Sequence, residues 1–514
     1  MIPLRTLPFL STLLLGPLLA FSSQPALAAT DQVFDIVAPF EIGGADPSLS
    51  GFIFQRMEIG ETLLGVDAEG RPQPGLAASW TVSDDGLVWT LPIRENVRFH
   101  DGSVLTAQAA ADSLKRAQAK PGVLERAKIE GITAENGAVV IRLREPFAPL
   151  SALLAHYSTI ILAPSSYGEN GSVKQIQATG PYRLTLFQAP QRLEVEAFAD
   201  YWGEKPAIAK ATYLAAGRGE TRTLMAESGD VDLAFQLDPP SIARLSANRS
   251  VTVMKAPLPR VMQLKVNAGN PPFDTVEGRT ALSEAIQREG LARAVLRAPG
   301  TSATQLFPPS VAGWHDPELP PLATDPERAK ARLAALGWVP GPDGIAQKDG
   351  KPLTLRLLTY ADRPELPLIA TALQDQLRQV GIAAEVAVTN SSSIPAGHQD
   401  GTLQLALAAR SYALVPDPFV TLLGDFREGG SDWGSMNWND PAFQSAMAQL
   451  LKATDSDEQA RLRDEIAGIL QRELPVIPVI WYEQTIAVTK AVEGARIDPF
   501  ERSFGLSAMR WVAP

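Results

Sequence analysis

The first 29 residues have the pattern of a leader removed after export, and this decides the compartment in which the rest of the chain has to fold. Arg5 gives a positive start, an apolar run occupies residues 7–19, and Ala26-Leu27-Ala28 provides the small residues of a cleavage site. The apolar run is too short to span a bilayer. We therefore expect cleavage after Ala28 or Ala29 and, in a bacterium with two membranes, a periplasmic protein.

The chain contains no cysteine, so a fold formed in an oxidising compartment has no disulfides to hold it and depends on apolar burial. The same absence removes thiolate nucleophiles, cysteine metal ligands and a lipid-modified cysteine that would tether the protein. The formal net charge is −11, without a basic run. This charge argues against nucleic acids and anionic membrane surfaces as partners.

The 514-residue chain is too long for a single hydrophobic core, which predicts two or three domains. Residues 353–359 and 382–388 have the composition of strands, and an amphipathic helix at 369–380 lies between them and ends at Gly381. This strand–helix–strand order predicts an α/β lobe with a parallel sheet. Asp325-Pro326 predicts the start of another helix, with the aspartate as its cap.

The sequence offers little local support for an enzyme. Its four histidines, His100, His156, His315 and His398, are widely separated, which argues against a preformed metal site. Phosphate-binding loops, nucleophile elbows and zinc-protease motifs are absent from the sequence. We therefore predict no catalytic residue, no metal ligand and no cofactor, although a Ser/His/Asp triad assembled across the fold stays open.

Two short segments have the composition of ligand-contacting loops. Trp433 and Trp438 lie in the Gly/Ser/Asn-rich segment 429–439, where a tryptophan either forms the wall of a cleft or packs under its own loop. Arg410 and Tyr412 follow the apolar strand predicted at 403–409. Strand ends of this kind carry ligand contacts in α/β folds, and the alternative for Arg410 is a surface salt bridge.

A series of short motifs resembles the peptide/nickel-type solute-binding proteins of ABC importers, and their shared order covers the mature chain. The motifs occupy residues 76–80, 83–94, 97–102, 179–182, 200–206, 227–232, 285–288, 325–326 and 337–338. The resemblance is greatest to the nickel-binding branch, through 201–206, 306–311 and 391–394.

The resemblance implies a two-lobe periplasmic-binding-protein fold of the α/β class, with a cleft between the lobes. Its first lobe comprises a discontinuous domain, 30–65, 178–260 and 482–514, and a small extra domain, 66–177. Its second lobe is a single α/β domain, 261–481. Two chain crossings near Val261 and Tyr482 are expected to form the hinge, and Asp84, Asp230 and Arg222 are expected to be structural.

The resemblance also informs the choice of ligand. Peptide binders of the family hold the peptide's free amino group with an aspartate just before an Asp-Pro pair. Here the pair is Asp417-Pro418, and Leu414 stands at the aspartate's position. Loss of a buried carboxylate partner for an ammonium group counts against ordinary peptides. The nickel pocket is not kept either, because its cleft arginine falls on Tyr157, its tryptophan on Tyr412, and its histidine near 429–430, without a histidine nearby.

We therefore expect the periplasmic component of an ABC importer that closes around a small polar solute and delivers it to an inner-membrane permease. The expected solute is a nickel chelate, a metallophore or a modified peptide, and the protein is expected to be a monomer and not an enzyme. The cleft candidates are Tyr157, Arg260, Arg410, Tyr412, Trp433 and Trp438. Both arginines are expected to pair with ligand carboxylates. A di- or oligopeptide binder, an exported hydrolase and a chaperone-like binder of unfolded segments are the alternatives.

Overall fold

A ten-stranded mixed sheet organises the computed structural model, which describes residues 33–311, 313–361, 363 and 365–512. The predicted leader at residues 1–29 lies outside the described residues. The strand order is β17-β16-β18-β12-β19-β11-β1-β10-β9-β8. The strands are β1 (Val33–Ala38), β8 (Tyr182–Gln188), β9 (Arg192–Ala197), β10 (Lys210–Ala215), β11 (Leu233–Phe235), β12 (Val251–Val266), β16 (Thr354–Tyr360), β17 (Ala383–Thr389), β18 (Leu405–Ser411) and β19 (Val476–Thr489).

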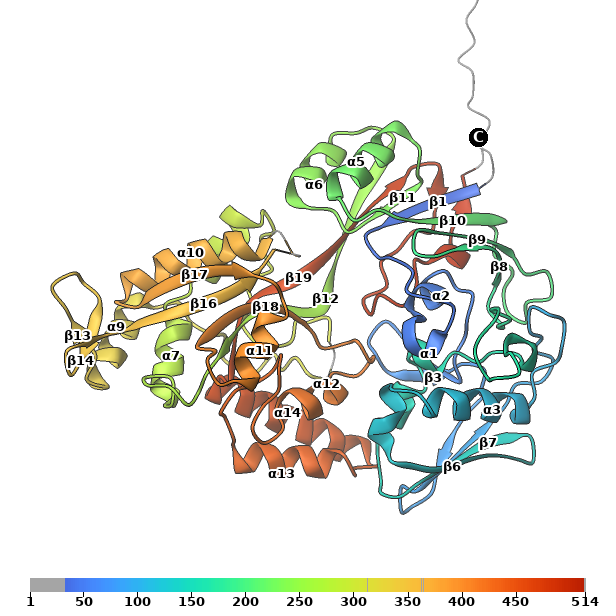
Figure 1. Ribbon diagram of the computed structural model, residues 1–514, viewed down its shortest axis with the longest axis horizontal. Helices are drawn as coiled ribbons and strands as arrows, with labels where there is room; N and C mark the ends of the chain where they lie inside the picture. Colours follow the sequence, from blue (N-terminus) through green and yellow to red (C-terminus); the bar gives the residue numbers. More distant parts are fainter. Residues whose placement is uncertain (1–32, 312, 362, 364, 513–514) are drawn as a thin grey trace, which may run out of the picture. The chain divides into compact units, whose positions relative to one another are not determined.

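Strands β12 and β19 are the longest, with 16 and 14 residues, and run together through the middle of the sheet (Figure 1). Their antiparallel pairing shifts register between Pro257 and Val261. Pro257 and Pro259 supply no backbone N–H, so a regular ladder cannot continue through this stretch. The crossings predicted near Val261 and Tyr482 fall beside this irregularity. That the chain bends here stays a prediction.

The strand–helix–strand unit predicted in the C-terminal half is present. Strands β16 and β17 are parallel neighbours, and helix α10 (Glu365–Gln379) connects them. The helix buries the side chains of Leu366, Ile369, Ala370, Leu373 and Leu377, whose three- and four-residue spacing places them on one face. The observed bounds differ from the expected ones by one residue for the strands and by up to four for the helix.

Further helices lie on both sides of the large sheet and beyond it (Figure 1). They are α2 (Phe52–Arg56), α5 (Gly219–Ser228), α6 (Pro239–Ser246), α7 (Val276–Glu284), α9 (Pro326–Ala335), α11 (Ser393–Gln399), α12 (Pro418–Asp425), α13 (Pro441–Leu450) and α14 (Ser456–Glu473). Asp325 caps α9 by accepting a hydrogen bond from the Arg328 amide, as its Asp-Pro start predicts.

A separate four-stranded antiparallel sheet, called the small sheet below, has a core of its own. It comprises β4 (Thr81–Val82), β5 (Val88–Pro92), β6 (Ile129–Glu135) and β7 (Ala138–Leu143), with helices α3 (Ala107–Gln118) and α4 (Leu150–Leu153) packed nearby. Val415 and Val420, from the chain after β18, join this core. The Arg126 guanidinium donates to the Val420 carbonyl at 2.7 Å, and the Ala148 amide to that of Leu451 at 2.9 Å.

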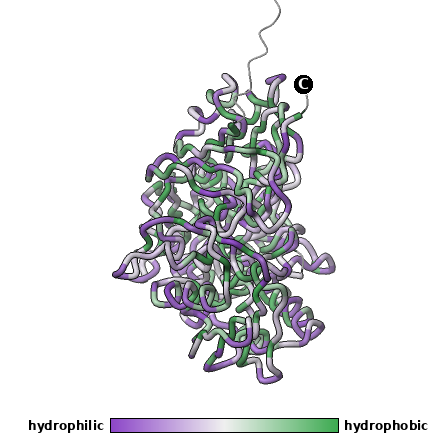
Figure 2. The backbone as a smooth tube through the Cα atoms, turned by 90° about the vertical axis from the view of Figure 1, so that its right-hand side faces the viewer, coloured by the Kyte–Doolittle hydropathy of each residue, from purple (hydrophilic) through white to green (hydrophobic). Residues whose placement is uncertain are grey.

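Burial of apolar side chains holds the described part of the chain together. Hydrophobic stretches of the chain lie largely in the interior, and hydrophilic stretches follow many of the outer loops (Figure 2). Within the residues that are described, none of the helices combines the length and apolar character needed to cross a bilayer. The mixed α/β class predicted from the sequence is confirmed.

One buried charge fixes a loop to the central strand β12. The Lys265 side chain is 1% exposed, and its ammonium group donates to the carbonyls of Ser431 at 2.7 Å, Gly434 at 2.7 Å and Ser435 at 3.2 Å. Burial lowers the pKa of Lys265 to about 7. These three hydrogen bonds hold segment 431–435 against the sheet.

We expect Lys265→Met to lower the free energy of unfolding by about 2 kcal/mol, because three buried carbonyls lose their donor. Urea denaturation measures the change. Lys255→Met on the same strand is the matched control, since Lys255 pairs with Glu483 at 3.3 Å near the surface and contributes less than about 1 kcal/mol. Equal losses for the two variants would contradict the structural role of Lys265.

Candidate functional site

A cavity of about 250 Å³ lies beside the register shift of β12. Its lining comes from segments far apart in the sequence: Phe40, α2, residues 155–157, Gln236, Arg260 of β12, Arg363, the chain between 411 and 416, and residues 500–502. We call it the arginine pocket, because Arg56, Arg260, Arg363 and Arg502 line it together with one carboxylate, Glu501. The lining therefore has more guanidinium groups than carboxylates, and one of these arginines, Arg502, pairs with Asp498 outside the lining at 3.1 Å.

Glu501 pairs with two of these arginines. Arg260 donates to its carboxylate at 2.7 Å, and Arg56 contacts the other oxygen at 3.5 Å and donates to the Glu501 carbonyl at 2.7 Å. Burial by itself would raise the pKa of Glu501, but the Arg260 and Arg56 guanidinium groups outweigh it and hold the pKa below its usual value. Glu501 is therefore ionised at neutral pH and occupies guanidinium donors that an incoming carboxylate could use.

The turn that presents Glu501 is held in an uncommon conformation. Glu501 has a φ of 54°, in the left-handed region that costs a side-chain-bearing residue free energy. Asp498 holds this turn, because its carboxylate accepts from the amides of Phe500 and Arg502 at 3.0 Å each, and its carbonyl from the Glu501 amide at 3.0 Å. The strained residue is thus kept in place by three hydrogen bonds to one neighbour.

Arg56 sits in an aromatic cage at the end of α2. Its guanidinium carbon lies 4.4 Å from the ring centre of Phe40, 5.5 Å from that of Phe52 and 5.6 Å from that of Phe235. The residue is 9% exposed, and its Nη1 atom has no hydrogen-bond partner among the described residues. A buried N–H without an acceptor is costly, so Nη1 of Arg56 is a donor that the described residues leave unused.

Two more arginines flank Tyr482 of β19. The guanidinium carbons of Arg260 and Arg363 lie 5.0 Å and 5.3 Å from the centre of its ring. Arg363 also donates to the Tyr482 hydroxyl at 3.2 Å. The two central strands therefore place Arg260 and Tyr482 together, and the chain before α10 adds Arg363.

Arg222 supports the pocket from behind without entering it. Its buried guanidinium donates to the carbonyls of Ala216 at 2.7 Å, Phe235 at 3.0 Å and Gln236 at 2.5 Å. Gln236, which lines the pocket, has a φ of 60° and is held there by Arg222. These contacts agree with the structural role expected for Arg222.

Of the six residues predicted to contact a ligand, Tyr157 and Arg260 line the arginine pocket. Tyr157 stacks on His156, with ring centres 3.9 Å apart. Trp433 is half-buried beside Tyr360, and Trp438 is 5% exposed in an apolar cluster. Ligand contact by these two tryptophans stays a prediction.

The structure gives Arg410 and Tyr412 partners within the protein. Arg410 forms a two-pronged ion pair with Asp425, at 2.6 Å and 2.8 Å, and Asp425 is 3% exposed. Tyr412 is 1% exposed and donates to the Gln263 side chain at 2.9 Å. Their contact with a ligand also stays a prediction.

Sequence reasoning missed Arg56, Arg363, Glu501 and His156, which all line the pocket. Each is a lone polar residue without a motif, so the sequence carries no local signal for it. Leu414 is singled out from the sequence because it replaces the aspartate that holds the amino group of a peptide in peptide binders. It lines the pocket and is 59% exposed.

His156 contributes a neutral ring to the pocket, because burial and the nearby Arg126 lower its pKa to about 4. The other histidines, His100, His315 and His398, line none of the arginine pocket. In the part of the chain that the structure describes, no three histidine, aspartate or glutamate side chains are grouped so that they could hold a metal ion.

The family is decided by a match of residues 71–432 to the family model for the middle part of bacterial extracellular solute-binding proteins, family 5. The chain belongs to family 5. The glutathione-binding protein GsiB of Escherichia coli O1:K1 / APEC is 28% identical over 507 residues, 93% of each chain. GsiB of Salmonella typhi is 27% identical over 518 residues, 94% of this chain and 95% of that protein.

Solved structures share the fold of this family 5 chain. NikA from Brucella suis in complex with Fe(III)-EDTA superposes with a TM-score of 0.84 and 24% identity, covering 93% of this chain and 99% of that one. The nickel ABC transporter protein of Bacillus halodurans has a TM-score of 0.80 and 25% identity, with the same coverage. A dipeptide-binding protein from Pseudoalteromonas sp. SM9913 with Met-Leu has a TM-score of 0.74, 19% identity, and coverage of 93% and 100%. The predicted family and two-lobe α/β fold are therefore confirmed.

We expect Arg410→Met to lower the free energy of unfolding by about 3 kcal/mol, because it leaves the Asp425 carboxylate buried and unpaired. The double variant Arg410→Met/Asp425→Asn should recover part of this loss. Chemical denaturation of both variants measures the effect. An unchanged unfolding midpoint together with weaker solute binding would instead support Arg410 as a ligand contact.

The lowered pKa of Glu501 predicts a pH-dependent contribution to stability. Its carboxylate stabilises the folded state above the ordinary glutamate pKa, and that contribution is lost as the pH falls through the lower folded value. Wild type should therefore exceed Glu501→Gln in thermal stability above about pH 5, and the difference should shrink below about pH 4. A difference that is constant from pH 3 to pH 7 would contradict the ion pairs.

Proposed function

We propose that this protein is the periplasmic solute-binding component of an ABC importer and that it holds a small solute by the solute's carboxylates in the arginine pocket. The observation that carries the proposal is the excess of guanidinium groups over the single Glu501 carboxylate. The unpartnered Nη1 of the buried Arg56 supports it. Guanidinium groups bind carboxylates with two parallel hydrogen bonds, which gives both affinity and orientation.

The lining favours a modified peptide or a carboxylate chelate over an ordinary peptide. Leu414 offers no counter-charge to a free peptide amino group. The glutathione of the GsiB relatives and the EDTA of the Brucella suis NikA complex each carry more than one carboxylate. The positive lining also disfavours a bare metal cation, so nickel would enter only inside an organic chelate.

Transport would follow from binding without chemistry on the solute. Arg56 belongs to α2, near the β8 end of the large sheet, whereas Arg363 precedes α10 near the β17 end. A solute held by both would favour a closed arrangement of the lobes, since a ligand stabilises the state that it contacts better. The closed form, expected to be a monomer, would then dock on the inner-membrane permease and release the solute unchanged.

Two substitutions with opposite effects test the carboxylate site. Arg260→Met should weaken solute binding about 10- to 100-fold, because a buried charge-assisted contact is lost. Glu501→Gln should tighten binding, because the competing internal carboxylate is neutralised. Calorimetry with glutathione, Fe(III)-EDTA and chelator-free Ni²⁺ as separate probes measures both effects.

Arg183→Met is the control and should leave affinity unchanged, since the exposed Arg183 of β8 pairs with Glu196 of β9 and does not line the arginine pocket. We expect glutathione or the chelate to bind and the bare ion not to bind tightly. Tight stoichiometric binding of bare Ni²⁺, or the same affinity in Arg260→Met and wild type, would overturn the carboxylate site. Turnover of a bound peptide would favour the alternative of an exported hydrolase.

A further inference from the structure

A second cavity, of about 560 Å³, adjoins the arginine pocket and shares Pro416 and Phe500 with its lining. We propose that this outer chamber holds an aromatic or bulky apolar group of the same solute whose carboxylates bind in the arginine pocket. The inference rests on the proposed function and deepens it, because it names the second half of the solute. The solute would be a short acid with an amide bond and a bulky apolar side group.

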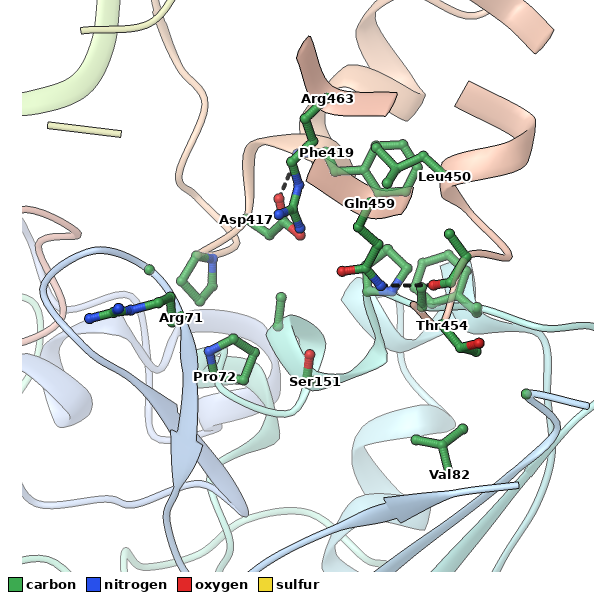
Figure 3. A pocket seen from close by; sticks show the side chains of 18 of the residues that line it. Arg71, Pro72, Val82, Ser151, Asp417, Phe419, Leu450, Thr454, Gln459 and Arg463 are labelled. Carbon is green, nitrogen blue, oxygen red and sulfur yellow. Dashed lines mark hydrogen bonds between the residues drawn. The ribbon is translucent and has the colours of Figure 1, made fainter. Parts of the chain in front are cut away.

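The walls of the outer chamber come from both the small sheet and the helices that face it (Figure 3). Val82 of β4 and Ser151 of α4 lie on the small-sheet side, and Phe419, Leu450 and Arg463 of α12, α13 and α14 lie opposite. The chamber is therefore complete only while these two parts are held together. The Arg126–Val420 and Ala148–Leu451 hydrogen bonds described above provide that connection.

Both walls contain aromatic rings. The small-sheet side contributes Trp80, Trp89 and Phe147, and the opposite side contributes Trp314 and Phe419. The rings of Trp314 and Phe419 are stacked, with centres 6.3 Å apart and an angle of 23° between their planes. Walls of this composition favour a flat apolar occupant, which gains by leaving water and by packing against the rings.

Two buried donors indicate that the occupant also carries hydrogen-bond acceptors. Trp89 is 4% exposed, yet its indole Nε1 has no hydrogen-bond partner among the described residues. The Nε of Arg463 is likewise buried without a partner among the described residues, and the guanidinium carbon lies 5.8 Å from the centre of the Trp314 ring. Because buried donors are costly when unpaired, an acceptor on the solute, such as an amide carbonyl, would stabilise whichever of the two it reaches.

The three acidic residues that line the chamber, Glu69, Asp84 and Asp417, are balanced by three basic ones, Arg71, Lys452 and Arg463, so the lining has no excess negative charge to favour a cationic occupant. The Asp417 carboxylate accepts from the Phe419 amide at 2.9 Å as the cap of α12. Glu69 pairs with Arg71 at 3.0 Å. The chamber thus pairs apolar walls with unpaired N–H donors, and the arginine pocket beside it supplies the positive charge.

Two probes that differ only in a benzyl group test the chamber: γ-glutamylglycine and γ-glutamylphenylalanine. Both carry the carboxylates that the arginine pocket requires, and only the second fills the outer chamber. We expect wild type to bind γ-glutamylphenylalanine about 10- to 100-fold more tightly in calorimetry, from burial of the aromatic ring.

Val82→Trp should fill the chamber and abolish this preference while leaving the affinity for γ-glutamylglycine unchanged. Thr454→Trp on the opposite wall should do the same and serves if Val82→Trp fails to fold. The matched control is Val104→Trp, because Val104 is 51% exposed and lines neither cavity.

The outcomes separate this inference from the proposed function. Equal affinities of wild type for the two probes would overturn the outer chamber and leave the carboxylate site standing. A preference for γ-glutamylphenylalanine that persists in both tryptophan variants would also overturn the chamber. Failure of wild type to bind either probe would overturn the carboxylate site and the chamber together.

Discussion

The antiparallel pairing of β12 with β19 is the constraint on which the rest of the described structure depends. In the strand order of the described sheet, this pair lies between β17, β16 and β18 on one side and β11, β1, β10, β9 and β8 on the other. Their register shift, beside two prolines, lies next to Arg260, which lines the arginine pocket and whose guanidinium carbon is 5.0 Å from the centre of the Tyr482 ring. The irregularity that interrupts the sheet therefore lies beside Arg260, one of the guanidinium donors of the arginine pocket.

The arginine pocket is stable without a ligand because Glu501 supplies the negative charge that the arginines need. Its carboxylate takes donors from Arg260 and Arg56, as a bound carboxylate would. A solute therefore competes with an internal partner, and its affinity is the difference between two similar interactions. This explains why neutralising Glu501 and removing Arg260 are expected to change affinity in opposite directions.

The candidate site shows where sequence reasoning stops. Arg410 and Tyr412 stand at a strand end, as expected, but Asp425 pairs with Arg410 and Gln263 binds Tyr412. Asp425 lies one helix further along the chain, and Gln263 lies on a strand about 150 residues earlier. Neither partner is visible from local pattern, because β18 and β12 become neighbours only in the folded sheet.

Local pattern alone was enough for the α/β class, the β16–α10–β17 unit, the capped start of α9 and, through the order of its motifs, the family. These features depend on hydrophobic periodicity, caps and turns, which are short-range properties of the chain. The tertiary structure alone decided that Arg56, Arg363 and Glu501 surround one pocket, and that the small sheet and three helices enclose a second cavity. The physical reason is that charge complementarity and cavity shape arise between residues hundreds of positions apart, such as Arg56 and Glu501, and no local pattern encodes their contact.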